Sequence, residues 1–139
     1  MAILAGIDEA GFGPLLGPLV VTSAVFSVPR ELAEVDLWEH FGRSVGRTRK
    51  HLAGRLLIAD SKKAYDRSRG LGHLERTVLA VLRGMGHEPT VLNGLLDLLC
   101  PDCLPRLSAY PWYQGLQNCA LPAVGPDVRI AAKVFADDV

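Results

Sequence analysis

Two apolar runs open the chain, and a segment rich in glycine and proline separates them. Residues 2–7 are mostly aliphatic and lead into Asp8 and Glu9, a pattern typical of a buried strand that gives way to a turn near Asp8. Residues 19–26 are rich in valine and other strand-forming residues and predict a second, largely buried strand. We therefore expect the two runs to pair as a hairpin.

The spacing of apolar positions then changes to that of a helix. Apolar residues recur on one face over residues 32–41, which predicts a short helix with Pro29 suited to its first position and Gly42 to its end. A second amphipathic pattern predicts a helix over residues 74–82, closed by Gly84.

The last third of the chain is less regular. Residues 89–96 fit a strand or a helix, and residues 100–126 hold five of the nine prolines, which predicts a proline-rich insertion or long loop. Residues 128–135 alternate like a half-exposed strand. This order of elements predicts an α/β domain over residues 1–139 whose C-terminal part is missing, while a small complete α+β domain stays open.

The composition is that of one soluble globular domain. The chain has 139 residues, 49% of them apolar, and no unbroken apolar run of the ~20 residues that a membrane helix needs. No basic segment precedes the first apolar run, and Asp8 and Glu9 interrupt it, which argues against a signal peptide. We expect a cytoplasmic protein with no membrane partner.

Three cysteines, an odd number, argue against a framework of disulfides. The spacing of Cys100 and Cys103 fits half of a zinc site or a redox pair, but Cys119 has no such neighbour. We expect ordinary reduced thiols in a loop. The four histidines are scattered without the spacing of a zinc site, so surface roles are expected for them.

The net charge is zero, but the basic residues are unevenly placed. Between Arg43 and Arg69 lie nine of the fifteen basic residues, with only Asp60 and Asp66 as acids, which gives this basic segment a local charge of +7. Such a cluster suits the phosphates of a nucleic acid. A solvated loop explains the composition equally well.

Asp8 and Glu9 are the first candidates for chemistry. Neighbouring carboxylates repel each other, so a divalent cation, a basic partner or water must neutralise the pair. Carboxylate oxygens at a strand end suit Mg²⁺ or Mn²⁺. The alternative is structural, with Asp8 bonding backbone amides in a turn and Glu9 pointing into solvent.

Two sequence motifs narrow the choice. The run from Gly6 to Val21, GIDEAGFGPLLGPLVV, resembles the opening of the ribonuclease HII family, and Asp60-Ser61-Lys62-Lys63 resembles its second signature. The resemblance covers roughly residues 3–83. It implies an α/β fold of the ribonuclease H-like type, in which helices flank a mixed sheet.

The family resemblance also implies an activity and a set of site residues. Asp8 and Glu9 would be two of four acids that bind Mg²⁺ or Mn²⁺ in an endonuclease that hydrolyses RNA, or single ribonucleotides, in RNA–DNA hybrid duplexes. The backbone of Gly11-Phe12-Gly13 would contact the ribose 2′-hydroxyl, which distinguishes RNA from DNA. Ser61 with Lys62 or Lys63 would hold substrate phosphates.

The chain departs from the family in two respects. Phe12 stands where the family has arginine, so a cationic contact to the substrate is lost. The other two acids have no clear counterpart, and Asp137 and Asp138 are candidates only because they follow the last predicted strand. Without those acids we expect little or no nuclease activity. The alternative function is a non-catalytic module on the same fold that binds nucleic acid or a protein.

Overall fold

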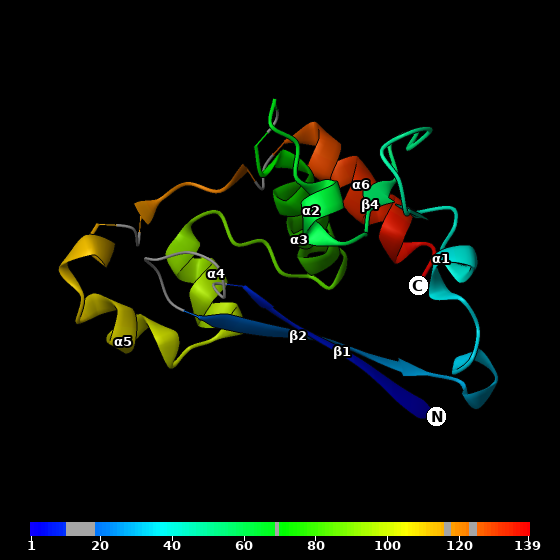
Figure 1. Cartoon of the computed structure of the whole chain (residues 1–139), viewed down its shortest axis with the longest axis horizontal. Coiled ribbons are helices and arrows are strands. Elements are labelled where there is room, and N and C mark those ends of the chain that lie inside the picture. The colour runs from blue at the N-terminus through cyan, green and yellow to red at the C-terminus, as the bar shows by residue number, and fades with distance from the viewer. Residues whose placement is uncertain (11–18, 69, 116–117, 123–124) are drawn as a thin grey trace. The chain divides into compact units, whose positions relative to one another are not determined.

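The computed structural model describes residues 1–10, 19–68, 70–115, 118–122 and 125–139. Within them the chain forms two compact units, Met1–His40 and Phe41–Val139. Strands and helices both occur (Figure 1). The strands of the described residues form two sheets of two strands each. The α/β class is therefore confirmed, whereas the single domain over residues 1–139 stays a prediction.

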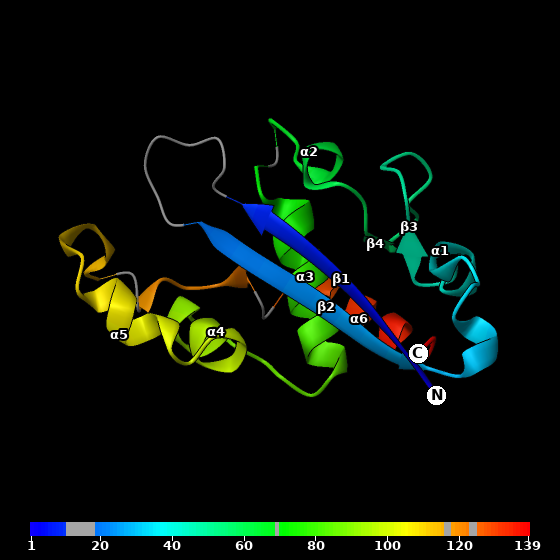
Figure 2. The same cartoon turned by 60° about the horizontal axis from the view of Figure 1, so that its bottom comes forward.

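The first unit is built on an antiparallel hairpin of β1 (Ala2–Ala10) and β2 (Val20–Val28), drawn as two long arrows in Figure 2. The register pairs Ala2 with Val28 and Ala10 with Val20. The predicted hairpin is thus confirmed. Strand β1 continues past the end predicted near Asp8, because its last residues still pair with the start of β2.

The expected burial of the second strand is wrong. Of the nine residues of β2 only Val28 is buried, and Val25 is 61% exposed. In β1 the side chain of Ile7 is likewise exposed. A two-stranded sheet leaves the side chains on both of its faces open to solvent. These side chains become buried only where further strands or a helix pack against the sheet.

The helix predicted over residues 32–41 is broken into two short pieces. A 3₁₀ turn, η1, covers Arg30–Leu32, and α1 covers Leu37–His40. The cause is Asp36, whose carboxylate accepts a hydrogen bond of 2.9 Å from the Trp38 amide. This side chain caps a new helix start instead of continuing the first turn.

The second unit packs two helices against a short parallel sheet. Strands β3 (Val45–Gly46) and β4 (Leu56–Leu57) pair in parallel, and α2 (Ser61–Ala64) follows. Helix α3 (Gly72–Gly84) confirms the predicted helix and lies beside α6 (Pro126–Ala136), as Figure 1 shows. The buried core of this unit consists of Val45, Leu56, Leu79, Ala80, Val128, Ala131, Ala132 and Phe135.

The strand predicted over residues 128–135 is wrong, because this segment lies within helix α6. The buried residues are Val128, Ala131, Ala132 and Phe135, a spacing of three and four that belongs to one helix face. Pro126 begins the helix, where its missing amide hydrogen costs nothing. Ile130 and Val134, which suggested alternation, are exposed.

The segment predicted as a long loop, residues 100–126, is helical in part. The residues before it, which fit a strand or a helix, lead into helix α4 (Leu92–Leu99). Helix α5 (Cys103–Ser108) and the 3₁₀ turn η2 (Pro111–Tyr113) follow α4. Leucines at helical spacing explain these elements, because α4 and α5 turn Leu96, Leu104 and Leu107 toward one pocket. The prolines did not prevent helix formation, because two of them stand in the first turn of a helical element.

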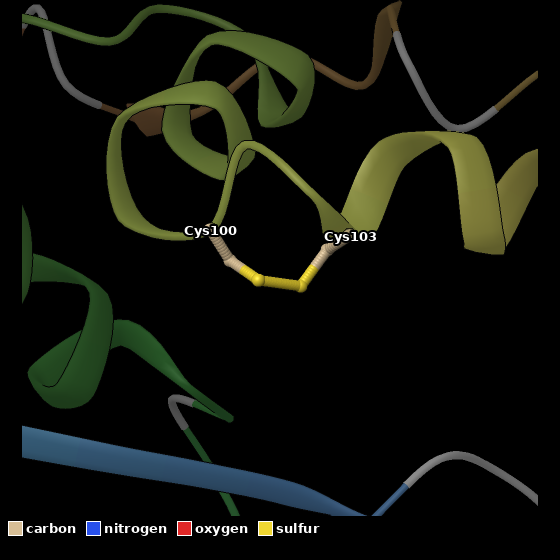
Figure 3. The surroundings of a disulfide bond; sticks show 2 residues. All are labelled: Cys100 and Cys103. Atoms are coloured by element: carbon tan, nitrogen blue, oxygen red, sulfur yellow. A yellow bond between two sulfur atoms is a disulfide. The ribbon is translucent and has the colours of Figure 1, made fainter.

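A disulfide joins Cys100, at the end of α4, to Cys103, the first residue of α5 (Figure 3). The expectation of reduced thiols is wrong for this pair, because their Cα atoms lie 5.4 Å apart, within the range that a disulfide bridges. Cys119 is free and exposed.

Candidate functional site

Asp8 and Glu9 lie near the end of strand β1, and both are exposed. The Asp8 carboxylate accepts a hydrogen bond of 2.9 Å from the amide of Glu9. Among the described residues, no basic side chain pairs with either carboxylate. Two neighbouring negative charges therefore stand open to water or to a cation.

The strand geometry separates these two side chains. Asp8 pairs with Thr22 and Glu9 with Val21, so both belong to the regular part of the hairpin. Successive side chains of a strand point to opposite faces. Coordination of one ion by both carboxylates requires the strand to bend or end between them. The assignment of both as metal ligands stays a prediction.

The proposed ribose-contacting turn, Gly11, Phe12 and Gly13, lies outside the described residues. Its predicted role therefore stays a prediction as well.

The second motif begins helix α2. Asp60 is its N-cap, and the Asp60 carboxylate accepts a hydrogen bond of 2.9 Å from the amide of Lys62. Ser61, Lys62 and Lys63 follow in the only turn of this helix, and all three are exposed. The cap explains the need for aspartate at this position. The two lysines are thereby presented to solvent, where they can meet phosphates.

The rest of the basic segment combines exposed cations with one structural arginine. Its exposed members are Arg43, Arg47, Arg49, Lys50, Lys62, Lys63 and Arg67. Arg55 instead binds the loop before it, donating from Nε to the Leu52 carbonyl at 3.1 Å, from Nη1 to Gly42 at 2.9 Å and from Nη2 to His51 at 2.8 Å. This network fixes a loop in which His51 and Ala53 have positive φ angles.

Arg49 forms an ion pair with Asp66. Hydrogen bonds from the hydroxyl and the amide of Ser68, at 2.6 and 2.8 Å, lower the pKa of Asp66 from 3.8 to about 2, and Arg49 contributes to the same effect. Asp66 is therefore ionised at any physiological pH, and it offsets one of the positive charges of the segment.

Asp137 and Asp138 follow a helix and not the predicted strand. Asp137 pairs with Lys133 at 3.2 Å, one helical turn earlier. The Asp138 carboxylate accepts hydrogen bonds from the amide and hydroxyl of Ser44, at 3.1 and 2.7 Å. Both acids thus have structural partners in the second unit. No group of three or more His, Cys, Asp or Glu side chains that could hold a metal occurs in the described part of the chain.

Sequence reasoning overlooked Arg76, which lies at the centre of the second unit. Its guanidinium contacts both carboxylate oxygens of Asp127, at 2.6 and 3.0 Å, and donates to the carbonyls of Gly54 and Arg55, at 2.6 and 3.0 Å. These partners are 21 to 51 residues away in sequence, so no local pattern could have indicated them.

Comparison of the chain with models of protein families, with curated proteins and with solved structures found no match. Across the described ranges, no helix is both long enough and apolar enough to span a membrane. The resemblance to ribonuclease HII thus depends on the two sequence motifs alone.

Proposed function

We propose that this protein is a divalent-metal-dependent endonuclease of the ribonuclease HII type, which hydrolyses RNA or single ribonucleotides within RNA–DNA hybrid duplexes. The observation that carries the proposal is the pair of exposed carboxylates, Asp8 and Glu9, which have no basic partner among the described residues. In this proposal the β1–β2 hairpin belongs to a ribonuclease H-like mixed sheet.

The donor chemistry of the carboxylate pair fits Mg²⁺ or Mn²⁺. Mg²⁺ in phosphate-processing sites is held by one or two carboxylates, with waters and substrate phosphates completing its shell. In the regular strand either Asp8 or Glu9 can supply one such group, and a bend between them would bring both to one ion. Their exposure leaves room for a substrate. When bound, the ion would activate water and stabilise negative charge on the phosphate that is cut.

The basic segment has the complementary task of holding the nucleic acid. Lys62 and Lys63, fixed in the first turn after the Asp60 cap, would bind backbone phosphates, and the exposed arginines of the loop would add to the same field. Binding of this kind releases counterions, so the affinity should fall steeply as salt is added.

A second candidate function is nucleic-acid binding without cleavage. It is favoured by the partners of Asp137 and Asp138, because both acids are engaged within the second unit.

A cleavage assay separates the two functions. The full chain is incubated with three labelled duplexes of one sequence: an RNA–DNA hybrid, a DNA duplex with one ribonucleotide, and an all-DNA duplex. The endonuclease function predicts products from the first two in Mg²⁺ or Mn²⁺ and none in EDTA or from all-DNA, whereas a chain without the two further acids should give little or no product. Binding of the hybrid without product at any metal concentration would establish the second function. Equal cleavage of all-DNA would contradict the proposed specificity.

A further inference from the structure

The second unit contains a pocket of about 720 Å³ that is partly open to solvent and has three arginines in its lining. This volume is in the range of pockets that bind small molecules. Its wall comes from the loop that ends at Arg55, the turn at Asp66, and the first turns of α3 and α6. The lining residues that matter here are Arg49, Arg55, Asp66, His73, Arg76 and Asp127.

Arg55 gives the pocket a positive charge without a counterion. Its guanidinium is half-buried and donates to backbone carbonyls of Leu52, Gly42 and His51. Within the described ranges no carboxylate pairs with it. Carbonyl dipoles satisfy its hydrogen-bonding groups but leave its net charge in place, so the pocket favours an anion.

Arg49 is a movable donor at the same pocket. Its side chain is 44% exposed and pairs with Asp66. Asp66 also accepts two hydrogen bonds from Ser68, so it stays satisfied when Arg49 turns away. An exposed pair of this kind is weak. The Arg49 guanidinium can therefore leave Asp66 and pair with an incoming anion with little loss of free energy.

His73 adds a donor on another side of the pocket. His73 is half-buried and lines the pocket from the first turn of α3. The bidentate Arg76–Asp127 pair also bonds the Gly54 carbonyl and so joins the remaining parts of the wall. An anion in this pocket would thus meet the His73 imidazole and, once Arg49 has left Asp66, the Arg49 guanidinium.

We propose that this pocket binds a phosphate group between Arg49 and His73, in the field of Arg55. An arginine fork suits phosphate oxygens, and the surrounding segment of nine basic residues favours a ligand with several phosphates. Resting on the proposed function, we assign this phosphate to the backbone of the nucleic-acid duplex, away from the bond that is cut.

The test measures binding without catalysis. The affinity of the full chain for a fluorescent RNA–DNA hybrid is measured by anisotropy at several salt concentrations in EDTA, for the wild type, Arg49→Gln and His73→Ala. Arg83→Gln is the matched control, because it removes an arginine of the same unit that pairs with Glu88 outside the pocket. We expect Arg49→Gln to lower the slope of log affinity against log salt by about 1, and the control to leave it unchanged.

A second titration identifies the source of the phosphate. Adenosine monophosphate and inorganic phosphate are added separately to isotope-labelled full chain, and the side-chain NMR signals of Arg49 and His73 are followed. Shifts with both ligands, together with the reduced salt slope, support the proposal. Nucleotide binding with an unchanged slope for Arg49→Gln would overturn the assignment to nucleic acid.

Failure of this proposal can be told apart from failure of the nuclease function. An unchanged hybrid affinity and salt slope in both pocket variants, together with Arg49 and His73 signals that do not shift in the wild type, would overturn the phosphate site, even in a chain that cuts hybrids. A reduced salt slope in a chain that never cuts would support the site and contradict the nuclease.

Discussion

In the hairpin of the first unit Ile3 and Ile7 are 67% and 75% exposed, whereas in the second unit Leu56 and Ala80 are completely buried. The hairpin has an apolar sequence but exposed side chains, whereas residues of β3, β4, α3 and α6 form one buried core. An apolar strand therefore does not imply a core. What decides burial is whether another element is available to cover the strand.

The two units also differ in the charge that they present. The first presents Asp8 and Glu9, which have no basic partner in the described residues, and the second presents the basic segment from Arg43 onward. This difference assigns them different tasks in the proposed function, with metal binding in the first unit and phosphate binding in the second. Each task can be removed separately by mutation.

The largest expected effect on stability comes from the core of the second unit. Phe135→Ala removes a buried ring between α6 and α3 and should lower the free energy of unfolding by about 3–5 kcal/mol. Ile7→Ala in the exposed hairpin should change it by less than about 0.5 kcal/mol. Urea unfolding of the full chain, followed by helical circular dichroism, measures both. Equal losses would show that the hairpin has a core of its own.

Arg76→Gln should have the next largest effect. It breaks the bidentate pair with Asp127 and the bonds to the Gly54 and Arg55 carbonyls, so we expect a loss of about 2 kcal/mol. Arg76→Lys should recover only part of this loss, because an ammonium group lacks the planar fork. Full recovery in the same unfolding experiment would mean that the positive charge of Arg76, and not its planar fork, makes this contribution.

Asp138→Ala should cost about 1 kcal/mol, because the amide and hydroxyl of buried Ser44 lose a charged acceptor and keep only the Phe41 carbonyl, at 3.0 and 3.3 Å. Asp137→Ala is the matched control. It breaks only an exposed pair with Lys133 and should cost about 0.5 kcal/mol or less. The difference in thermal midpoint between the two variants measures the structural role of Asp138. Equal midpoints would show that Asp138 has no such role and would make it a candidate metal ligand again.

Part of this difference between the two units could be predicted from the sequence. The hairpin followed from two apolar runs, and α3 from its amphipathic spacing. Helix α6 was misassigned because Ile130 and Val134 suggest alternation, while the residues that pack inward are Val128, Ala131 and Phe135. Two of the inward residues on α6 are small alanines, which carry a weak hydrophobic signal.

The residues of the candidate site also differ in whether the sequence alone could indicate them. Asp8, Glu9 and the Asp60-Ser61-Lys62-Lys63 motif could be proposed from their local sequence, and their roles stay predictions, while the structure adds that Asp60 is a helix cap. The pocket around Arg49, Arg55 and Arg76 could not be identified, because its walls come from segments brought together only by packing. Long-range pairs such as Arg76–Asp127 leave no pattern in a single sequence.

The smallest expected effect concerns acid. Because the pKa of Asp66 is about 2 in the folded chain, below its ordinary 3.8, Asp66 favours the folded state above about pH 4. This contribution is lost as the pH falls from about 4 toward 2. An NMR titration of the Asp66 carboxyl carbon should show the low value, and Ser68→Ala should raise it. A midpoint near 3.8 in the wild type would contradict the role of Ser68.

The division of tasks between the units is tested most directly by Asp8→Asn, assayed for cleavage and for binding of one RNA–DNA hybrid. We expect cleavage in Mg²⁺ to fall by at least about 100-fold, as expected when a metal ligand is lost, while the affinity for the hybrid in EDTA stays within about twofold. Cleavage equal to that of the wild type would contradict the account, because the carboxylate in the first unit would then have no part in catalysis.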